Sequence, residues 1–131
     1  MNPKALLLIT TFIMVLHGLA ILFGAGSAAQ MGVENISDDA LNMGKGAYEI
    51  AGFFNLFLAA VLVSARKLDI AGLRALSRGI AIGWVFLFAG VLYHIATLIP
   101  GQAPPTAMGG VFGLVAAWAV YVAFGTKDEA A

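Results

Sequence analysis

The stretch ALLLITTFIMVLHGLAILFGA, residues 5–25, contains no Asp, Glu, Lys or Arg and a single ionisable side chain, His17. A helix needs about 20 predominantly apolar residues to cross the hydrocarbon core of a bilayer. Three similar stretches follow at residues 47–65, 79–99 and 107–124. They lack the period-two alternation of barrel strands. The sequence therefore predicts an all-α membrane protein: a four-transmembrane-helix bundle that makes residues 1–131 a single integral membrane domain.

The composition supports lipid as the main surrounding of this chain. Of its 131 residues 61% are hydrophobic and 11% are charged, against about 45–50% and about 25% in soluble domains. The net charge of zero offers no electrostatic basis for nucleic-acid binding. The sequence contains no cysteine, which excludes disulfides, thiolate metal sites and thiol redox chemistry within this chain.

The first apolar stretch has two interpretations. Lys4, the apolar run and then Ser27-Ala28-Ala29 together resemble a signal peptide with a small-residue cleavage site. However, the run from Ala5 to Phe23 is longer than the apolar part of a typical signal peptide, and it contains His17. We therefore expect this segment to be retained as the first transmembrane helix.

The connections between the stretches differ in character. Ser37-Asp38-Asp39 is typical of a helix start, with a capping hydroxyl followed by acids at the positive end of the helix dipole. It predicts either a short surface helix or an extension of the second span. Residues 66–78 form a connection that carries four Lys or Arg, and residues 100–106 are uncharged with three prolines.

The distribution of basic residues predicts the topology. Lys4, the connection 66–78 and Lys127 hold six of the seven Lys and Arg residues, and they fall on one side of the four predicted spans. The other side has only Lys45. By the positive-inside rule, both termini are predicted to be cytoplasmic.

Four polar side chains are predicted to lie at similar depth in the outer half of the membrane. They are His17, Glu49, Asn55 and His94, and a rise of 1.5 Å per residue places them within about 9 Å of one another in depth. Tyr93 adjoins His94 near the outer interface. Polar groups at such positions are costly and often mark a site or a partner. We therefore take these five residues as candidate ligand-binding residues.

Three interpretations of these residues remain open. In the first, Glu49 accepts a hydrogen bond from an imidazole or keeps that imidazole protonated. The imidazole could then hold a quinone carbonyl or relay a proton. His17 and His94 could ligate haem, or bind a metal together with Glu49. Alternatively, the side chains only form hydrogen bonds between helices. No metal-ligand set is complete, no catalytic residue is identified, and no cofactor beyond quinone or haem is suggested.

Small residues recur at helical spacing in the third and fourth spans. Two faces are predicted to pack against a helix, either within the chain or in a partner. The first is formed by Gly79, Gly83 and Gly90, and the second by Gly109, Gly113 and Ala116. Each contains a GxxxG pattern, which is common in membrane helices.

Three motifs resemble those of the DoxX-like family of small four-helix membrane proteins. They are HGLAILFG at 17–24, YEIAG at 48–52 and AGVLYH at 89–94. Where the family commonly has a lysine in the first helix, this chain has Ile21. The resemblance implies a bacterial inner-membrane protein and a redox-linked accessory role, since some members are named as membrane subunits of thiosulfate:quinone oxidoreductases.

Three functions follow in order of preference. The first is an accessory or anchoring subunit of a quinone-linked redox complex. The second is a structural or chaperone-like membrane protein that docks on another membrane protein, or on itself, through its glycine faces. The third is a small transporter or channel protomer. An enzyme is the less favoured interpretation, because the sequence holds no nucleophile elbow, phosphate loop or zinc-protease motif.

Overall fold

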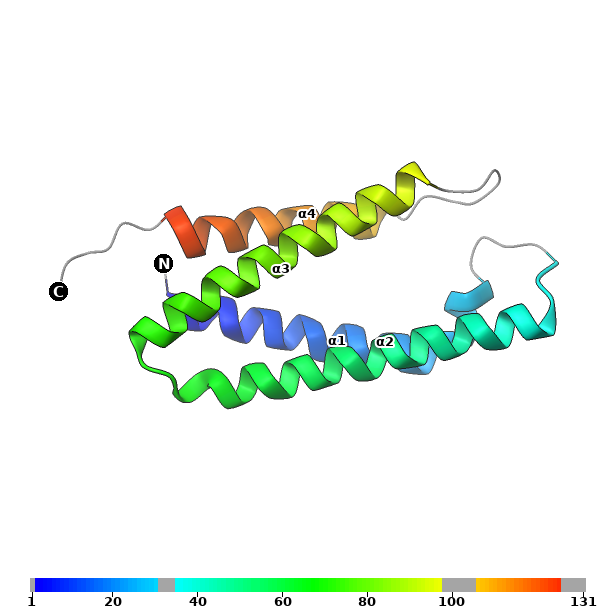
Figure 1. Cartoon of the computed structure of the whole chain (residues 1–131), viewed down its shortest axis with the longest axis horizontal. Helices are drawn as coiled ribbons and strands as arrows, with labels where there is room; N and C mark the ends of the chain where they lie inside the picture. Colours follow the sequence, from blue (N-terminus) through cyan, green and yellow to red (C-terminus); the bar gives the residue numbers. More distant parts are fainter. Residues whose placement is uncertain (1, 31–34, 98–105, 126–131) are drawn as a thin grey trace. The chain divides into compact units, whose positions relative to one another are not determined.

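A computed structural model describes residues 2–30, 35–97 and 106–125, with the side chains of 106–108 left out. Every regular element in these ranges is helical (Figure 1). The elements are α1 (Pro3–Gln30), α2 (Asp38–Ser64), the 3-10 turn η1 (Ala65–Lys67), α3 (Ile70–Ala96), α4 (Thr106–Val120) and the π-helical segment η2 (Tyr121–Gly125).

Three of the four helices are long and apolar enough to cross a membrane. α1 has 28 residues, and α2 and α3 have 27 each. This confirms an all-α protein with three helices long enough to span a membrane. α4 is shorter than the other three, with 15 residues, and η2 extends it by a π-helical segment of 5 residues.

The fourth predicted span therefore differs from the other three. Fifteen α-helical residues rise about 22 Å, whereas the hydrocarbon core is about 30 Å thick. Pro104 and Pro105 directly precede Thr106. α4 begins at Thr106, one residue before the predicted start of the fourth span at 107.

The predicted helix start at Ser37 is confirmed. The Ser37 hydroxyl accepts a hydrogen bond from the backbone N–H of Ala40 at 3.3 Å, and its carbonyl accepts from that of Leu41 at 2.9 Å. Asp38 and Asp39 occupy the first turn of α2, where the helix dipole favours acids. Of the two alternatives, the structure shows the extension of the second span.

The third helix begins nine residues earlier than predicted, at Ile70 instead of 79. Asp69 caps its N-terminus, because its Oδ1 accepts a hydrogen bond from Gly72 N at 2.7 Å. Arg74 and Arg78 therefore lie on α3 and not in a loop. The prediction of a connection over 66–78 was wrong because it followed hydrophobicity alone and overlooked this cap.

The described residues form two compact units. The α1–α2 unit contains residues 9–30 and 35–64, and the α3–α4 unit contains residues 2–8, 65–97 and 106–125. Each unit is described by itself below.

In the α1–α2 unit, two antiparallel helices approach closely at glycines (Figure 1). A Cβ added at Gly18 would lie 3.0 Å from the carbonyl oxygen of Gly52. A Cβ added at Gly52 would lie 3.0 Å from the Gly18 oxygen and 2.7 Å from Leu22 Cγ. Further along, a Cβ added at Gly44 would lie 3.2 Å from the Cβ of Ala29. Small residues thus let the backbones meet, which lipid-embedded helices need because hydrophobicity does not drive them together.

In the α3–α4 unit, the helices are also antiparallel. A Cβ added at Gly109 would contact Val91 Cγ1 at 3.5 Å, and one added at Gly113 would meet the Phe88 ring at 3.0 Å. As the residue number rises along α4, its contact on α3 moves toward the N-terminus. Gly113 therefore makes room for the Phe88 ring between the two helices.

We predict that Gly52→Ala lowers the stability of the folded chain in detergent micelles by about 1–3 kcal/mol, as overpacking of a tight contact does. Gly46→Ala is the matched control on α2, because a Cβ there meets no described atom within 4 Å. The control should be neutral or slightly stabilising, since alanine is the better helix former. Equal unfolding midpoints for the two variants would contradict a glycine contact.

Candidate functional site

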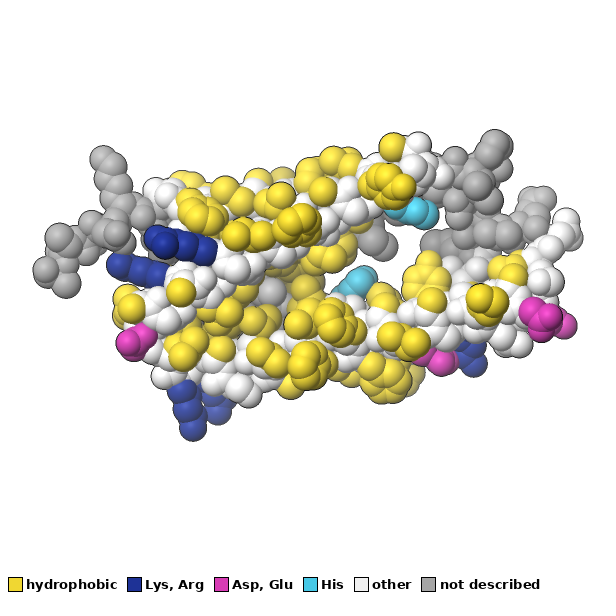
Figure 2. Space-filling view, viewed as in Figure 1, with side chains coloured by type: hydrophobic (Ala, Val, Ile, Leu, Met, Phe, Trp, Pro, Cys, Tyr) yellow, Lys and Arg dark blue, Asp and Glu magenta, His cyan; other side chains and the backbone are white. Residues whose placement is uncertain are grey.

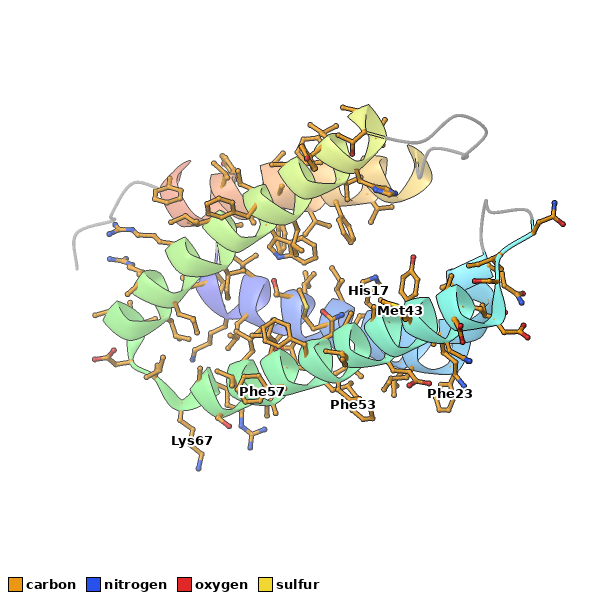
Figure 3. All side chains as sticks on the ribbon, turned by 45° about the vertical axis from the view of Figure 1, so that its right-hand side comes forward. His17, Phe23, Met43, Phe53, Phe57 and Lys67 are labelled. Atoms are coloured by element: carbon orange, nitrogen blue, oxygen red, sulfur yellow. The ribbon has the colours of Figure 1, made fainter. Side chains whose placement is uncertain are left out.

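His17 on α1 and Asn55 on α2 form a direct polar contact between two membrane-length helices. The Asn55 amide nitrogen Nδ2 lies 3.2 Å from Nδ1 of His17, and the pair is partly buried. Figure 3 labels His17 on α1. The sequence placed these two residues at similar depth, and the structure brings them together.

A second hydrogen bond fixes the orientation of the Asn55 amide. Its Nδ2 also donates to the carbonyl oxygen of Ala51, one turn earlier, at 3.0 Å. Turning the amide over would place its oxygen against that carbonyl and lose the bond. Since Nδ2 is a donor only, Nδ1 of His17 must accept. A neutral ring that accepts at Nδ1 carries its proton on Nε2, so Asn55 selects the Nε2–H tautomer of His17.

The glycine contact explains why this pair can form. Gly18 follows His17 directly, and Gly52 precedes Asn55 by three residues, which is about 60° around the helix at 3.6 residues per turn. Asparagine has a short side chain and reaches another helix only when the backbones are close. The contact of Gly18 with Gly52 provides this approach.

Glu49 is bound by a different partner. Its Oε1 lies 3.7 Å from Nζ of Lys45, one turn earlier on α2, and both side chains are about half exposed. Six residues separate Glu49 from Asn55, which places the two about 120° apart around the helix. The structure thus pairs Glu49 with a lysine, and the predicted contact with an imidazole stays a prediction. Exposed ion pairs of this spacing contribute only about 0.3–0.5 kcal/mol.

Tyr93 and His94 lie in the last turn of α3, both exposed, in the α3–α4 unit. Their carbonyl oxygens accept hydrogen bonds from Thr97, whose backbone N–H and hydroxyl close the helix end. The other three candidate residues belong to the α1–α2 unit. A site that combines both histidines, including the haem alternative, therefore stays a prediction. Within either unit, the described residues contain no group of three His, Cys, Asp or Glu that could hold a metal.

The two predicted glycine faces differ in their surroundings. Gly109 and Gly113 lie against α3, and Ala116 is buried. The other face is exposed and consists of Gly79, Gly83 and Gly90. A Cβ added at any of these three glycines would meet no atom within 4 Å among the residues described in the same unit. Of the two sets, only the one on α4 lines the contact between α3 and α4.

Sequence reasoning did not identify Gly18 and Gly52 as the residues that position the site. A signal for them exists: each glycine lies within one turn of a polar residue in an otherwise apolar segment. GxxxG spacing does not reveal this contact, because the two glycines face each other from different helices. A search for pairs of glycine and polar residues across neighbouring spans would have found it.

Comparison with known proteins gives no assignment. No protein-family model, curated protein or solved structure matches this chain. The resemblance to DoxX-like proteins accordingly remains one of short motifs. What can be said about function comes from the helices and the geometry described above.

We predict that ¹⁵N-histidine NMR of the full chain in nanodiscs finds His17 as the Nε2–H tautomer, with an unprotonated Nδ1, at a pH where the ring is neutral. Asn55→Leu should remove this preference, because leucine keeps the volume and loses the donor. The exposed His94 provides the internal reference and should not respond to the substitution. A His17 ring protonated on Nδ1 in the unaltered chain would contradict the assignment.

Proposed function

We propose that this protein is an accessory subunit of a quinone-linked membrane redox complex, in which His17 and Asn55 help to hold the quinone. In this proposal both termini lie in the cytoplasm, as the basic residues indicate. The membrane is the bacterial inner membrane, as the motif resemblance suggests. The chain itself supplies binding and orientation, and the partner supplies the redox chemistry.

The hydrogen bond between His17 and Asn55 is the observation that carries this proposal. It occurs between two helices of membrane-spanning length, where a polar side chain costs free energy unless it is paired. The His17 imidazole and the Asn55 amide both carry N–H donors. A quinone carbonyl is an apolar-soluble acceptor that suits donors of this kind.

The outward faces of the same unit support an accessory role. Large apolar side chains stay exposed on α2, including Phe53 at 64% and Phe57 at 61%, and Figure 3 shows both pointing outward from the helix. Such a surface suits lipid or the apolar helices of another membrane protein. Aromatic side chains are also common anchors where proteins bind each other.

A photoreactive quinone added to native membranes tests the site. We predict labelling of this chain that falls several-fold in His17→Leu and in Asn55→Leu. Ser64→Ala is the matched control, because it also removes a polar group from α2, one whose hydroxyl bonds only within the helix to Ala60 O at 2.9 Å. Labelling that is unchanged in both site variants would reject the quinone site.

Mass spectrometry of the proteins that co-purify in mild detergent tests the accessory role separately. An oxidoreductase recovered in stoichiometric amounts is the expected result. Recovery of the chain alone would contradict the accessory role without bearing on whether the chain binds quinone.

The exposed glycine face of α3 favours a second candidate function, that of a structural protein that docks on another membrane helix. Gly79 and Gly83 form a GxxxG pattern, and a Cβ added at either glycine would meet no described atom of their own unit within 4 Å. Small residues of this kind allow close helix contact in lipid.

We predict that Gly83→Leu weakens association of this chain in membranes, measured by cross-linking yield. It should leave the contact between α3 and α4 intact, because a Cβ added at Gly83 meets no described atom of α4 within 4 Å. Gly46→Leu on α2 is the control and should not change the yield. If Gly83→Leu has no effect either, the glycine face is not a docking surface.

A further inference from the structure

Four Lys and Arg residues lie in the chain between the end of α2 and the first turns of α3. Arg66 and Lys67 lie on η1, and Arg74 and Arg78 lie in the first three turns of α3; all four are exposed. We call residues 66–78 the basic segment. Figure 2 shows Lys and Arg side chains in two separate groups at this end of α3, and Figure 3 labels Lys67 in the lower one.

Positive charge exceeds negative charge in the sequence of residues 65–97. Asp69 is the one carboxylate in that range. One of its oxygens already accepts a hydrogen bond from Gly72 N at 2.7 Å as the cap of α3. The sequence of this range therefore holds four Lys or Arg side chains and a single carboxylate, one oxygen of which is engaged with the backbone. Such an excess attracts a polyanion or a negatively charged surface.

The cations are arranged along one end of a membrane-length helix. Arg74 and Arg78 are four residues apart, so their side chains leave the same side of α3, one turn above the other. From Ile70 to Arg78 the helix rises about 12 Å. Beyond Arg78 the helix continues for eighteen residues, 79–96, with no Asp, Glu, Lys or Arg. The basic segment is thus located where the span meets the membrane surface.

Exposed apolar side chains occur between the cations. Leu68 is 45% exposed and Ile70 is 53% exposed. A soluble polyanion such as a nucleic acid or an acidic peptide offers little to these side chains. A lipid surface satisfies both kinds, because apolar groups enter the acyl boundary while long basic side chains extend to the phosphates.

We propose that the basic segment binds the headgroup phosphates of anionic phospholipids and holds a shell of them around the start of α3. Arginine suits this role, since its planar guanidinium donates two parallel hydrogen bonds to a phosphate. This lipid site shares no residue with the proposed quinone site, so either can be correct without the other.

The test uses the full chain in liposomes of phosphatidylcholine with a minor fraction of phosphatidylglycerol. Brominated phosphatidylglycerol and brominated phosphatidylcholine are compared as quenchers of the tryptophan introduced by Ile82→Trp, since Ile82 is 51% exposed and lies one turn from Arg78, about 6 Å along α3. Trp84→Phe and Trp118→Phe remove the two native tryptophans, so that the introduced one is the only tryptophan. The ratio of the two quenching constants measures lipid preference.

We expect a marked preference for phosphatidylglycerol in the unaltered chain. Arg66→Gln, Lys67→Gln, Arg74→Gln and Arg78→Gln together should reduce this preference about tenfold or more. Arg66→Gln with Lys67→Gln should reduce it in part while leaving α3 untouched, so a folding defect in the fourfold variant cannot mimic the result. Lys45→Gln, a change of the same charge in the α1–α2 unit, should have no effect.

Three outcomes would overturn the proposal. One is an absence of preference in the unaltered chain. Another is an equal loss in Lys45→Gln, which would make net charge the cause. The third is full displacement of the lipid by inorganic phosphate at a matched phosphate concentration, which would indicate a soluble-anion site. Raising the salt concentration should weaken the preference without abolishing it, because screening acts over about 10 Å at 0.1 M.

Discussion

The contact between Gly18 and Gly52 determines how closely α1 and α2 approach, and the polar pair depends on that approach. In lipid, burying apolar side chains gives two helices no reason to associate, because the tails are as apolar as the side chains. Close packing and interhelical hydrogen bonds must replace that driving force. Here the two occur within one turn of each other: the glycines bring the backbones together, and Asn55 then reaches His17.

The packing of the two helices determines the protonation pattern of His17. Asn55 is oriented by the carbonyl of Ala51 on its own helix, and it in turn determines which nitrogen of His17 is protonated. A change at Gly18 or Gly52 would therefore alter the imidazole without touching it. Glu49 is not needed for this effect, because its partner is Lys45. The site consists of two side chains held by two glycines.

Much of the fold follows from the sequence because lipid imposes a simple length requirement. The three long apolar segments were predicted for that reason, and the helix start at Ser37 was predicted from its capping hydroxyl and the acids that follow it. The start of α3 was not predicted, since hydropathy excludes the stretch that holds Arg74 and Arg78 and does not reveal Asp69 as its cap. Of the candidate site residues, similar depth suggested His17 and Asn55. Depth alone does not show on which side of its helix a residue lies. Glu49 and Asn55 have similar depth but lie on different sides of α2.

A double-mutant cycle on His17 and Asn55 tests the central claim most directly. The unfolding free energy of the full chain in detergent is measured for the unaltered chain, His17→Leu, Asn55→Leu and the double variant. The bond from Asn55 to Ala51 O is lost in both Asn55 variants and cancels in the cycle. A coupling of about 0.6–1.7 kcal/mol is the predicted result. Additive effects, with no coupling, would contradict the account.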